Sequence, residues 1–179
     1  AETVAERFQV SREEQDAFAL RSQQKAATAQ EAGYFKQEIA PVILTDRKNH
    51  RTVVADDEYI RKDATLESLG KLRPAFQKNG TVTAGNASGI NDGAAALVLM
   101  PKSEAEAQGI PYLATIKGYA ETGIDPAIMG YAPYYAIKQV LDKTRLSAED
   151  IDLFELNEAF ASQSIAVIRD LGLPEEKIN

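Results

Sequence analysis

Cysteine is absent from the 179 residues, tryptophan is absent too, and histidine occurs only once. A chain without cysteine has no disulfide, no thiolate metal ligand and no cysteine nucleophile. The single histidine, His50, lies in the polar stretch TDRKNHRT, where no carboxylate or nucleophile is spaced to serve it. We therefore interpret His50 as a solvated residue of a hairpin and not as a catalytic base.

Basic residues are fewer than acidic ones, 20 against 27, which gives a net charge of −7. No basic stripe or Lys/Arg run interleaved with aromatic residues is present, so nucleic acid is excluded as the expected partner. No apolar run approaches the length of a membrane span and no signal peptide is recognisable, so we expect a soluble, cytoplasmic protein. Acidic residues show no clustered spacing, so we expect no metal site.

The N-terminal part of the chain, before the glycine-rich loop, predicts helices and one hairpin, and the hydrophobic content of 44% is enough for a buried core. Ser11 and Glu14 form a capping-box pattern before an alanine-rich helix that Gly33 can end. Further along, the pattern predicts strands at 39–44 and 51–55 around a turn, and a short helix at 65–72 that ends before Pro74.

From Gly80 onward a glycine-rich loop leads into a buried run and then into alternating elements. Gly85, Gly89 and Gly93 punctuate the loop, but the order G-x-G-x-x-G is missing and a strand follows, which excludes a dinucleotide site. The alternation predicts an α/β layer of mostly buried, largely parallel strands. Its expected elements are a helix capped by Ser103 with Glu106, a strand at 113–121, a helix at 134–143, a strand at 151–156 and a helix at 159–171.

Asn157, in LFELNEAFASQ, is expected at the corner between the last strand and the last helix. Two interpretations are open from the local sequence. The side chain can cap the helix, whose first N–H groups lack partners. Alternatively, it projects from the carboxyl edge of the sheet, where open α/β folds place their ligands.

Four motifs in order resemble the thiolase family: ATLESLGKLRPAF at 64–76, AGNASGINDGAAA at 84–96, DPAIMG at 125–130 and NEAFASQ at 157–163. Within that family, the likeness is strongest to the biosynthetic acetyl-CoA acetyltransferases. The resemblance implies a partial thiolase-like α/β fold. Residues 1–90 would belong to the loop domain that covers coenzyme A, 91–110 would complete the N-terminal βαβ half, and 111–179 would begin the C-terminal half.

The resemblance also implies roles for individual residues. Asn157 matches the asparagine that holds an ordered water in the oxyanion hole, and Ser88 matches the serine that contacts the pantetheine part of coenzyme A. Other residues fall where the family lines its coenzyme A site or acyl pocket, although each also fits a surface or core role: Arg61, Ser68, Phe76, Ala84, Ile90, Met129, Ala159 and Phe160. No tightly bound cofactor is implied; a coenzyme A thioester is the substrate.

Several features depart from the family pattern. The two catalytic cysteines and the Gly-His-Pro histidine are not in the chain, no start signal precedes the first helix, and LPEEKIN reads as the beginning of a strand. We therefore expect an internal piece of a homo-oligomeric acetyl-CoA acetyltransferase, inactive by itself. YAPYYA at 131–136 stands where a Gly-x-Gly-Pro pattern is usual, which leaves a longer-chain 3-ketoacyl-CoA thiolase open. A coenzyme A binding or assembly remnant is the other alternative.

Overall fold

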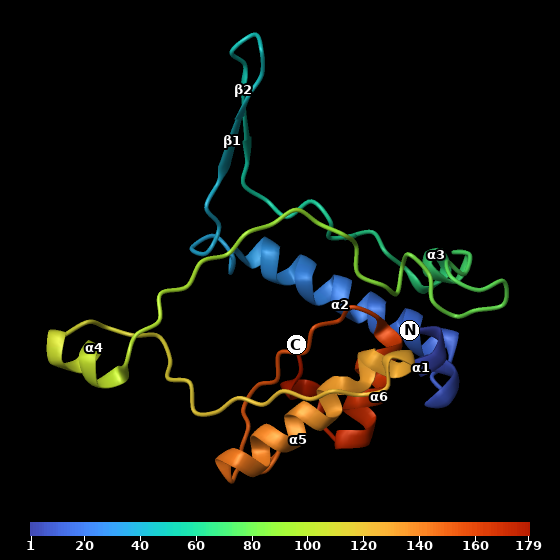
Figure 1. The fold of residues 1–179 in the computed structure, drawn as a ribbon. Helices are drawn as coiled ribbons and strands as arrows, with labels where there is room; N and C mark the ends of the chain where they lie inside the picture. Colours follow the sequence, from blue (N-terminus) through green and yellow to red (C-terminus); the bar gives the residue numbers. More distant parts are fainter.

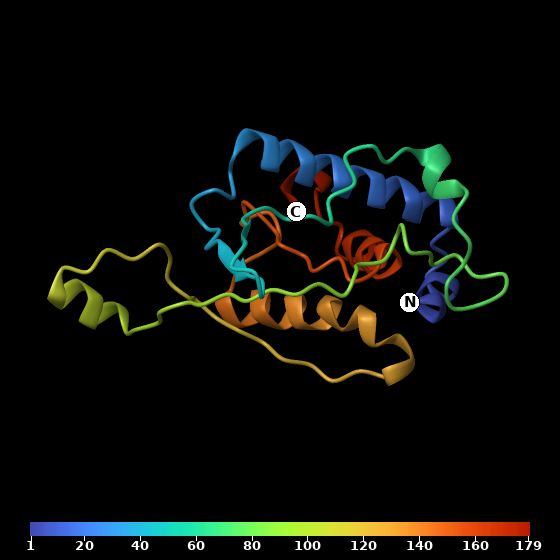
Figure 2. The same cartoon turned by 90° about the horizontal axis from the view of Figure 1, so that it is seen from above.

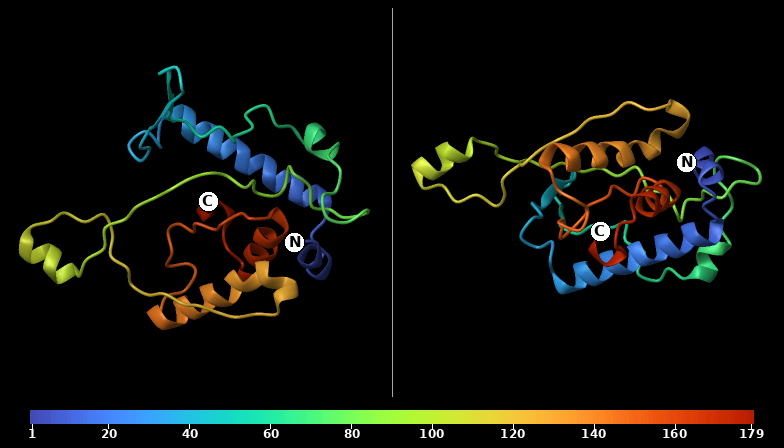
Figure 3. Two further views of the ribbon diagram at one scale, coloured as in Figure 1. Left: turned by 45° about the horizontal axis from the view of Figure 1, so that its top comes forward. Right: turned by 90° about the horizontal axis from the view of Figure 1, so that it is seen from below.

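The computed structural model describes all residues 1–179, and its main core is built by helices from both ends of the chain (Figure 1). Helix α6 (Ala161–Leu171) lies between α2 (Arg12–Ala32) and α5 (Ala132–Thr144), as two further views confirm (Figures 2 and 3). Helix α1 (Glu2–Arg7) and the short 3-10 helix η1 (Pro126–Tyr131) close against α6. The buried cluster at their junction contains Val4, Val10, Ile128, Tyr131, Ala166 and Val167.

Helix α2 begins and ends where the sequence predicts. The Ser11 hydroxyl accepts a hydrogen bond from the Glu14 N–H at 3.1 Å, and the Glu14 carboxylate accepts one from the Ser11 N–H at 2.7 Å. This reciprocal cap satisfies two N–H groups that a helix start leaves unpaired. Gly33 ends the helix with a φ of 77°, a left-handed conformation that glycine adopts without steric cost.

Strands β1 (Val42–Thr45) and β2 (Arg51–Val54) form the predicted antiparallel hairpin, which projects from the helical body (Figure 1). In its turn, the Asp46 carboxylate accepts hydrogen bonds from the N–H groups of Lys48 and His50. His50 is exposed, in agreement with the interpretation of a solvated hairpin residue, but the expectation that no carboxylate serves it is wrong, because its Nδ1 lies 3.1 Å from Asp46 Oδ2. The N–H groups that point at Asp46 lower the pKa of its carboxyl, the His50 N–H contributing most.

The predicted short helix is α3 (Leu66–Gly70), and its start is a second capping box. The Thr65 hydroxyl accepts from the Ser68 N–H, and the Ser68 hydroxyl oxygen accepts from the Thr65 N–H. Arg12 of α2 donates to the carbonyl oxygens of Leu69 and Leu72, at 2.8 Å and 3.0 Å. These bonds fasten the end of α3 to the beginning of α2.

The buried run expected after the glycine-rich loop, which ends at Met100, and the strand expected at 113–121 do not pair with any other segment of the chain. Both segments run as long unpaired stretches to and from α4 (Lys102–Gln108) (Figure 1), and Leu97 and Leu113 are 87% and 106% exposed. A strand is buried only when neighbouring strands and covering helices are present. The 179 residues do not supply these neighbours for either segment.

Parallel pairing of the predicted kind occurs at one place, between Phe154 and Ile178. Phe154, Leu173 and Ile178 form a second buried cluster around it, and the short 3-10 helix η2 (Glu175–Lys177) leads into the pairing. The strand expected at 151–156 is thus reduced to one isolated bridge. The terminal segment does extend beside it, as the sequence of 173–179 predicts.

The expected cap of α4 by Ser103 with Glu106 is wrong. Pro101 is the N-cap residue, and no side chain bonds to the first turn. Glu106 instead lies 3.5 Å from the Lys102 ammonium group. The helix is short and lies outside the buried core apart from Ala105, so its start depends on the chain direction that Pro101 imposes.

Candidate functional site

The turn that carries Ser88 lies directly against the segment that follows Asn157. The Ser88 N–H donates to the Ala159 carbonyl oxygen at 2.9 Å, and the Ala161 N–H donates to the Asn86 carbonyl oxygen at 3.0 Å. Between these two bonds, Ala87 and Phe160 form an antiparallel bridge. Two motifs that lie far apart in the sequence are therefore joined by main-chain hydrogen bonds.

The Asn86 side chain anchors this turn to helix α2. Its Oδ1 accepts from the Thr83 N–H at 2.8 Å, and its Nδ2 donates to the Asp16 carboxylate at 2.9 Å. Arg12 forms an ion pair with Asp16 at 2.7 Å. Asn86 and Asp16 are both buried, and their polar atoms are paired, as buried polar groups require.

A cavity of about 180 Å³ opens between α2, the Ser88 turn and Glu158. Ser88 is exposed and lines this cavity, so its hydroxyl is accessible to a ligand. Glu158 accepts a hydrogen bond from the Ser22 hydroxyl at 2.5 Å, which holds the cavity wall to α2. The full lining consists of Phe18, Ala19, Ser22, Gln23, Tyr59, Gly85, Asn86, Ala87, Ser88, Gly89, Asn91, Glu158 and Ala161.

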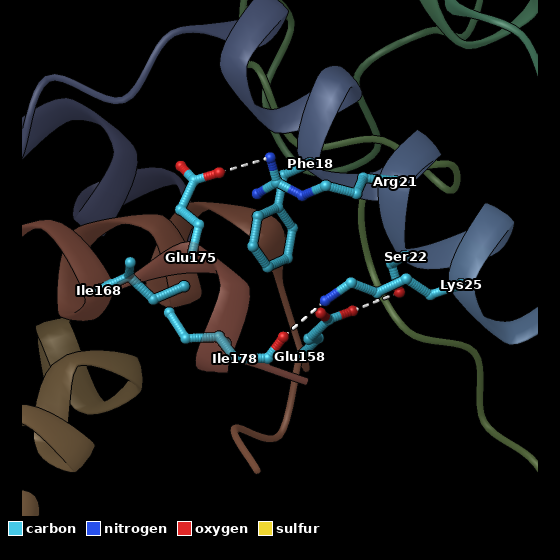
Figure 4. Close-up of a pocket in the computed structure, with 8 residues that line it drawn as sticks. All are labelled: Phe18, Arg21, Ser22, Lys25, Glu158, Ile168, Glu175 and Ile178. Atoms are coloured by element: carbon cyan, nitrogen blue, oxygen red, sulfur yellow. Dashed lines mark hydrogen bonds and ion pairs between the residues drawn. The ribbon is translucent and has the colours of Figure 1, made fainter. Parts of the chain in front are cut away.

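A smaller hollow of about 20 Å³ adjoins the other side of Glu158, and Figure 4 shows the ion pair and hydrogen bonds around it. Arg21 pairs with Glu175 at 2.9 Å, and the Lys25 ammonium donates to the Ile178 carbonyl oxygen at 2.5 Å. Together with the Ser22–Glu158 bond, these contacts tie α2 to the chain on both sides of α6. The segment just after Asn157 is therefore held by α2 as well as by the Ser88 turn.

Asn157 itself does not cap α6. The N-cap residue is Phe160, which provides no side-chain bond, and the Asn86 carbonyl oxygen accepts from the first helical N–H instead. Only the main-chain oxygen of Asn157 is bonded, by the Gln163 amide at 3.4 Å, and the side chain is exposed. The capping interpretation is thus wrong, and the Asn157 amide is available to a water or ligand.

Three of the other predicted residues, Ala159, Phe160 and Phe76, lie at the contact between the Ser88 turn and the segment after Asn157. Ala159 provides the carbonyl oxygen that Ser88 binds, and the Phe160 ring meets the Phe76 ring edge-on at 6.1 Å. Arg61 is linked to the Ser88 turn only through Tyr59. Its guanidinium lies 5.8 Å from the centre of the Tyr59 ring, and Tyr59 packs on Gly89 so closely that a Cβ there would be 2.6 Å from the ring.

The remaining predicted residues are either bonded within another element or exposed. The Ser68 hydroxyl is engaged in the capping box of α3, which agrees with the alternative of a helix hydroxyl. Ala84, Ile90 and Met129 are exposed, which rules out a core role for the two larger side chains within this chain. Met129 is followed by Gly130, where an added Cβ would lie 2.8 Å from the Gln163 amide oxygen.

Tyr59, Asn86 and Glu158 were not predicted as parts of the site. Asn86 and Glu158 lie inside two of the quoted motifs, and their polarity among small or apolar residues was a usable signal. Tyr59 carries no local signal because its role depends on contact with Gly89, which lies well beyond it in the sequence. No group of three or more His, Asp or Glu side chains is arranged to hold a metal ion. No helix is long and apolar enough to cross a membrane.

Comparison with known families agrees with the motifs. The profile of the thiolase N-terminal domain matches residues 1–103, and that of the thiolase C-terminal domain matches residues 110–179. These two matches cover nearly the whole chain. The chain belongs to the thiolase family.

Individual relatives are similar to this chain along its whole length. The acetyl-CoA acetyltransferase of Chromobacterium violaceum is 53% identical over 179 residues, and the probable acetyl-CoA acyltransferase of Staphylococcus aureus (strain COL) is 52% identical. In both comparisons the whole chain is matched, but it spans only 46% of the relative's length. The crystal structure of the Bacillus anthracis acetyl-CoA acetyltransferase matches 99% of the chain with a TM-score of 0.96 at 49% identity, and again 46% of that protein is covered. The fold is therefore a part of the thiolase fold.

Proposed function

We propose that the protein to which these residues belong is an acetyl-CoA C-acetyltransferase. It condenses two acetyl-CoA molecules to acetoacetyl-CoA, or runs the reverse thiolysis, through an acyl-cysteine intermediate. The observation that carries the proposal is the hydrogen bond between Ser88 and Ala159, which places the exposed Ser88 beside the segment of the exposed Asn157. The names of the relatives support the same reaction.

In this proposal Asn157 has the catalytic role within the chain. Removal of an α-proton from the second thioester places negative charge on its carbonyl oxygen, and a donor aimed at that oxygen lowers the barrier. The Asn157 amide is neutral and both donates and accepts, so it can orient a water toward the oxygen without adding charge. The nucleophilic cysteine and the histidine come from outside these residues, and the 179-residue chain alone is inactive.

The coenzyme A moiety is proposed to lie along the Ser88 turn. Ser88 faces the pantetheine arm, and Arg61, fixed on Tyr59, suits the adenine or phosphate end because a guanidinium both stacks and carries charge. Ser68, Phe76, Ala84, Ile90, Met129, Ala159 and Phe160 complete the proposed lining. No cofactor is tightly bound, and coenzyme A enters as part of the substrate.

The domain division and the assembly belong to the same proposal. Residues 1–90 cover coenzyme A, 91–110 complete the N-terminal half and 111–179 begin the C-terminal half. The exposed apolar stretches around Leu97 and Leu113 fit strands that pair with segments outside these residues. We place the parent protein in the cytoplasm as a homo-oligomer.

The test is the kinetics of thiolysis of acetoacetyl-CoA by the product of the complete reading frame. We expect Asn157→Ala to lower kcat by about 100-fold, as removal of one oxyanion-hole donor does, with a small effect on the KM for coenzyme A. Ser88→Ala should raise that KM and leave kcat nearly unchanged, because its contact is made equally in the ground and transition states. An unsubstituted protein that does not cleave acetoacetyl-CoA would refute the proposal.

A second candidate is a coenzyme A binding or assembly module without catalysis, favoured by the absence of cysteine together with the cavity beside Ser88. Titration of the 179-residue chain with coenzyme A distinguishes the two. Saturable binding that Ser88→Ala weakens, combined with a native product of 19.5 kDa, would favour the module. A native product with thiolase activity would favour the enzyme.

The acyl chain length is a separate part of the proposal. Tyr134 and Tyr135 follow Met129 closely in the sequence, and Tyr135 is exposed. We propose a preference for acetyl and acetoacetyl groups, which the names of the acetyl-CoA acetyltransferase relatives support. Equal or faster thiolysis of long-chain 3-ketoacyl-CoA by the product of the complete reading frame would show a longer-chain thiolase instead.

A further inference from the structure

Asn86 connects three separate parts of the candidate site. Its side chain accepts from the Thr83 N–H at 2.8 Å and donates to the Asp16 carboxylate at 2.9 Å and to the Thr81 carbonyl oxygen at 3.1 Å. Its own carbonyl oxygen accepts from the Ala161 N–H at 3.0 Å, at the first turn of α6. One residue thus joins α2, the Ser88 turn and the start of α6.

The chemistry of this position calls for an amide. The side chain must accept from a main-chain N–H and, at the same time, donate to a carboxylate and a carbonyl oxygen, and a short amide side chain has both capacities. Asn86 is 3% exposed and Asp16 is 4% exposed, so water does not replace a missing partner easily. Arg12 neutralises Asp16 at 2.7 Å and continues to the carbonyl oxygens that end α3.

The two bonds that join the candidate motifs flank this anchor. Ser88 closely follows Asn86 and bonds Ala159, while the Asn86 carbonyl oxygen holds Ala161, just after Asn157. We infer that Asn86 is a positioning residue for the thiolase reaction: through Asp16 and α2 it fixes the Ser88 turn and the Asn157 segment at one distance from each other. This inference rests on the proposed function, in which Ser88 holds the pantetheine arm of coenzyme A and Asn157 holds the water.

The kinetic test uses Asn86→Asp in the product of the complete reading frame. The new carboxylate faces Asp16, so the two charges repel and the turn moves away from α2. We expect kcat/KM for acetoacetyl-CoA thiolysis to fall by about 100-fold near neutral pH, as small displacements of reacting groups cause. The loss, taken as the ratio to the unsubstituted protein, should shrink as pH falls, because a proton shared by the two carboxyls restores a donor.

Other charged groups near Asn86 must be accounted for in that pH profile. Arg12 and Asp16 approach it from α2, Glu2 of α1 binds the neighbouring Thr81, and Glu158 lies across the cavity. None of them changes in the variant, so the ratio to the unsubstituted protein isolates the new pair. Active sites are counted in each sample by stoichiometric acylation with acetyl-CoA. A variant whose loss is fully explained by fewer active sites, with an unchanged pH ratio, would overturn the inference.

A charge-exchanged variant keeps the test informative if Asn86→Asp folds poorly. Asp16→Asn combined with Asn86→Asp restores one donor and one acceptor between the two side chains. We expect this double variant to recover at least about tenfold of the kcat/KM lost in Asn86→Asp, which corresponds to one buried hydrogen bond regained. A double variant no better than Asn86→Asp would count against a positioning role for the pair.

Amide hydrogen exchange tests the same coupling without catalysis. In Asn86→Ala the N–H groups of Ser88 and Ala161 should both exchange faster, by about tenfold or more, because each bond depends on the anchored turn. Amides of α5 serve as internal controls, and Asn91→Ala, in the same turn, is the matched variant that should leave both amides protected. Faster exchange at only one of the two amides would show that Asn86 does not couple the segments. If the unsubstituted protein lacks thiolase activity, the proposed function fails while this exchange experiment still decides the coupling.

Discussion

The phenol of Tyr131 donates a 2.5 Å hydrogen bond to the carboxylate of Asp170, which joins η1 to the last turn of α6. The Tyr131 ring is buried between the rings of Phe8 and Tyr134, on which it stacks. Burial, followed by the bond to the negative Asp170, raises the pKa of Tyr131 well above its ordinary value. The phenol therefore keeps its proton in the folded protein at pH values where an unfolded tyrosine loses it.

Tyr131→Phe should lower the free energy of unfolding near neutral pH by about 1 kcal/mol, because one hydrogen bond to a charged group is lost and Asp170 regains water. The folded pKa of Tyr131 is raised, so its stabilising contribution is present below pH about 10 and disappears as pH rises further. The difference between the two proteins should then shrink in urea titrations above pH 10. Tyr134→Phe, which loses no hydrogen bond, is the control; equal effects of the two variants would contradict this assignment.

Gly89→Ala should lower the free energy of unfolding by up to about 1 kcal/mol, since the added methyl group would lie 2.6 Å from the exposed Tyr59 ring and force it to move. The cost should nearly vanish when Tyr59 is itself replaced by alanine, which a double-mutant cycle measures by thermal unfolding. Gly93→Ala is the matched control because its Cβ meets nothing within 4 Å. A cost that persists without the Tyr59 ring would show that the contact is not the cause.

Ser11→Ala should destabilise the start of α2 by about 1 kcal/mol, the usual cost of losing an N-cap.

The Ser11 N–H, together with Arg169, lowers the pKa of Glu14 in the folded protein. A depressed carboxyl pKa contributes stability above pH about 4.3 that is lost as pH falls below it. Glu14→Gln should therefore flatten the acid side of the stability profile measured by circular dichroism, by a small amount because Glu14 is partly exposed. An acid side of the profile that Glu14→Gln leaves as steep as in the unsubstituted protein would contradict the assignment.

The exposed apolar stretches around Leu97 and Leu113 should make the 179-residue chain self-associate and bind the dye ANS. Leu97→Glu combined with Leu113→Glu should reduce both dye fluorescence and the apparent mass in light scattering, because charges on an unpaired strand oppose edge pairing. Ser103→Glu combined with Gln108→Glu adds the same two negative charges nearby on α4 without removing apolar surface. A reduction of the same size in that control would assign the effect to net charge alone.

The elements that the sequence predicted well are those defined by local contacts. Ser11 with Glu14 and the glycine at 33 specify the two ends of α2 through bonds within a few residues, and both are found. The buried run that ends at Met100 and the strand at 113–121 were predicted from apolar composition, but a strand needs partners from elsewhere in the chain. Apolar composition therefore predicted that these two segments are extended, but it could not predict which strands they pair with.

The candidate site was predictable in part for the same reason. Ser88 and Asn157 were singled out by motif resemblance, and the structure brings their segments together. The capping interpretation of Asn157 failed because α6 begins only at Ala161, with Phe160 as the N-cap residue, and the carbonyl oxygen of Asn86, from a distant part of the sequence, accepts from the first N–H of the helix. A long-range partner of this kind leaves no mark in the residues around Asn157.

The packing of Val4 and Val167 in one buried cluster bears on how the protein is made. During synthesis α1 and the beginning of α2 leave the ribosome before α6, the helix that covers them, which is synthesised long afterwards. Closing so long a loop adds little to the equilibrium cost, since that cost rises only with the logarithm of loop length. It delays burial, however, until translation has passed α6, and at ordinary elongation rates this wait lasts about ten seconds or more. During that interval the apolar face of α1 is open to chaperones, so depletion of nascent-chain chaperones should lower the yield of this protein more than that of one in which each helix packs on the next helix in the sequence.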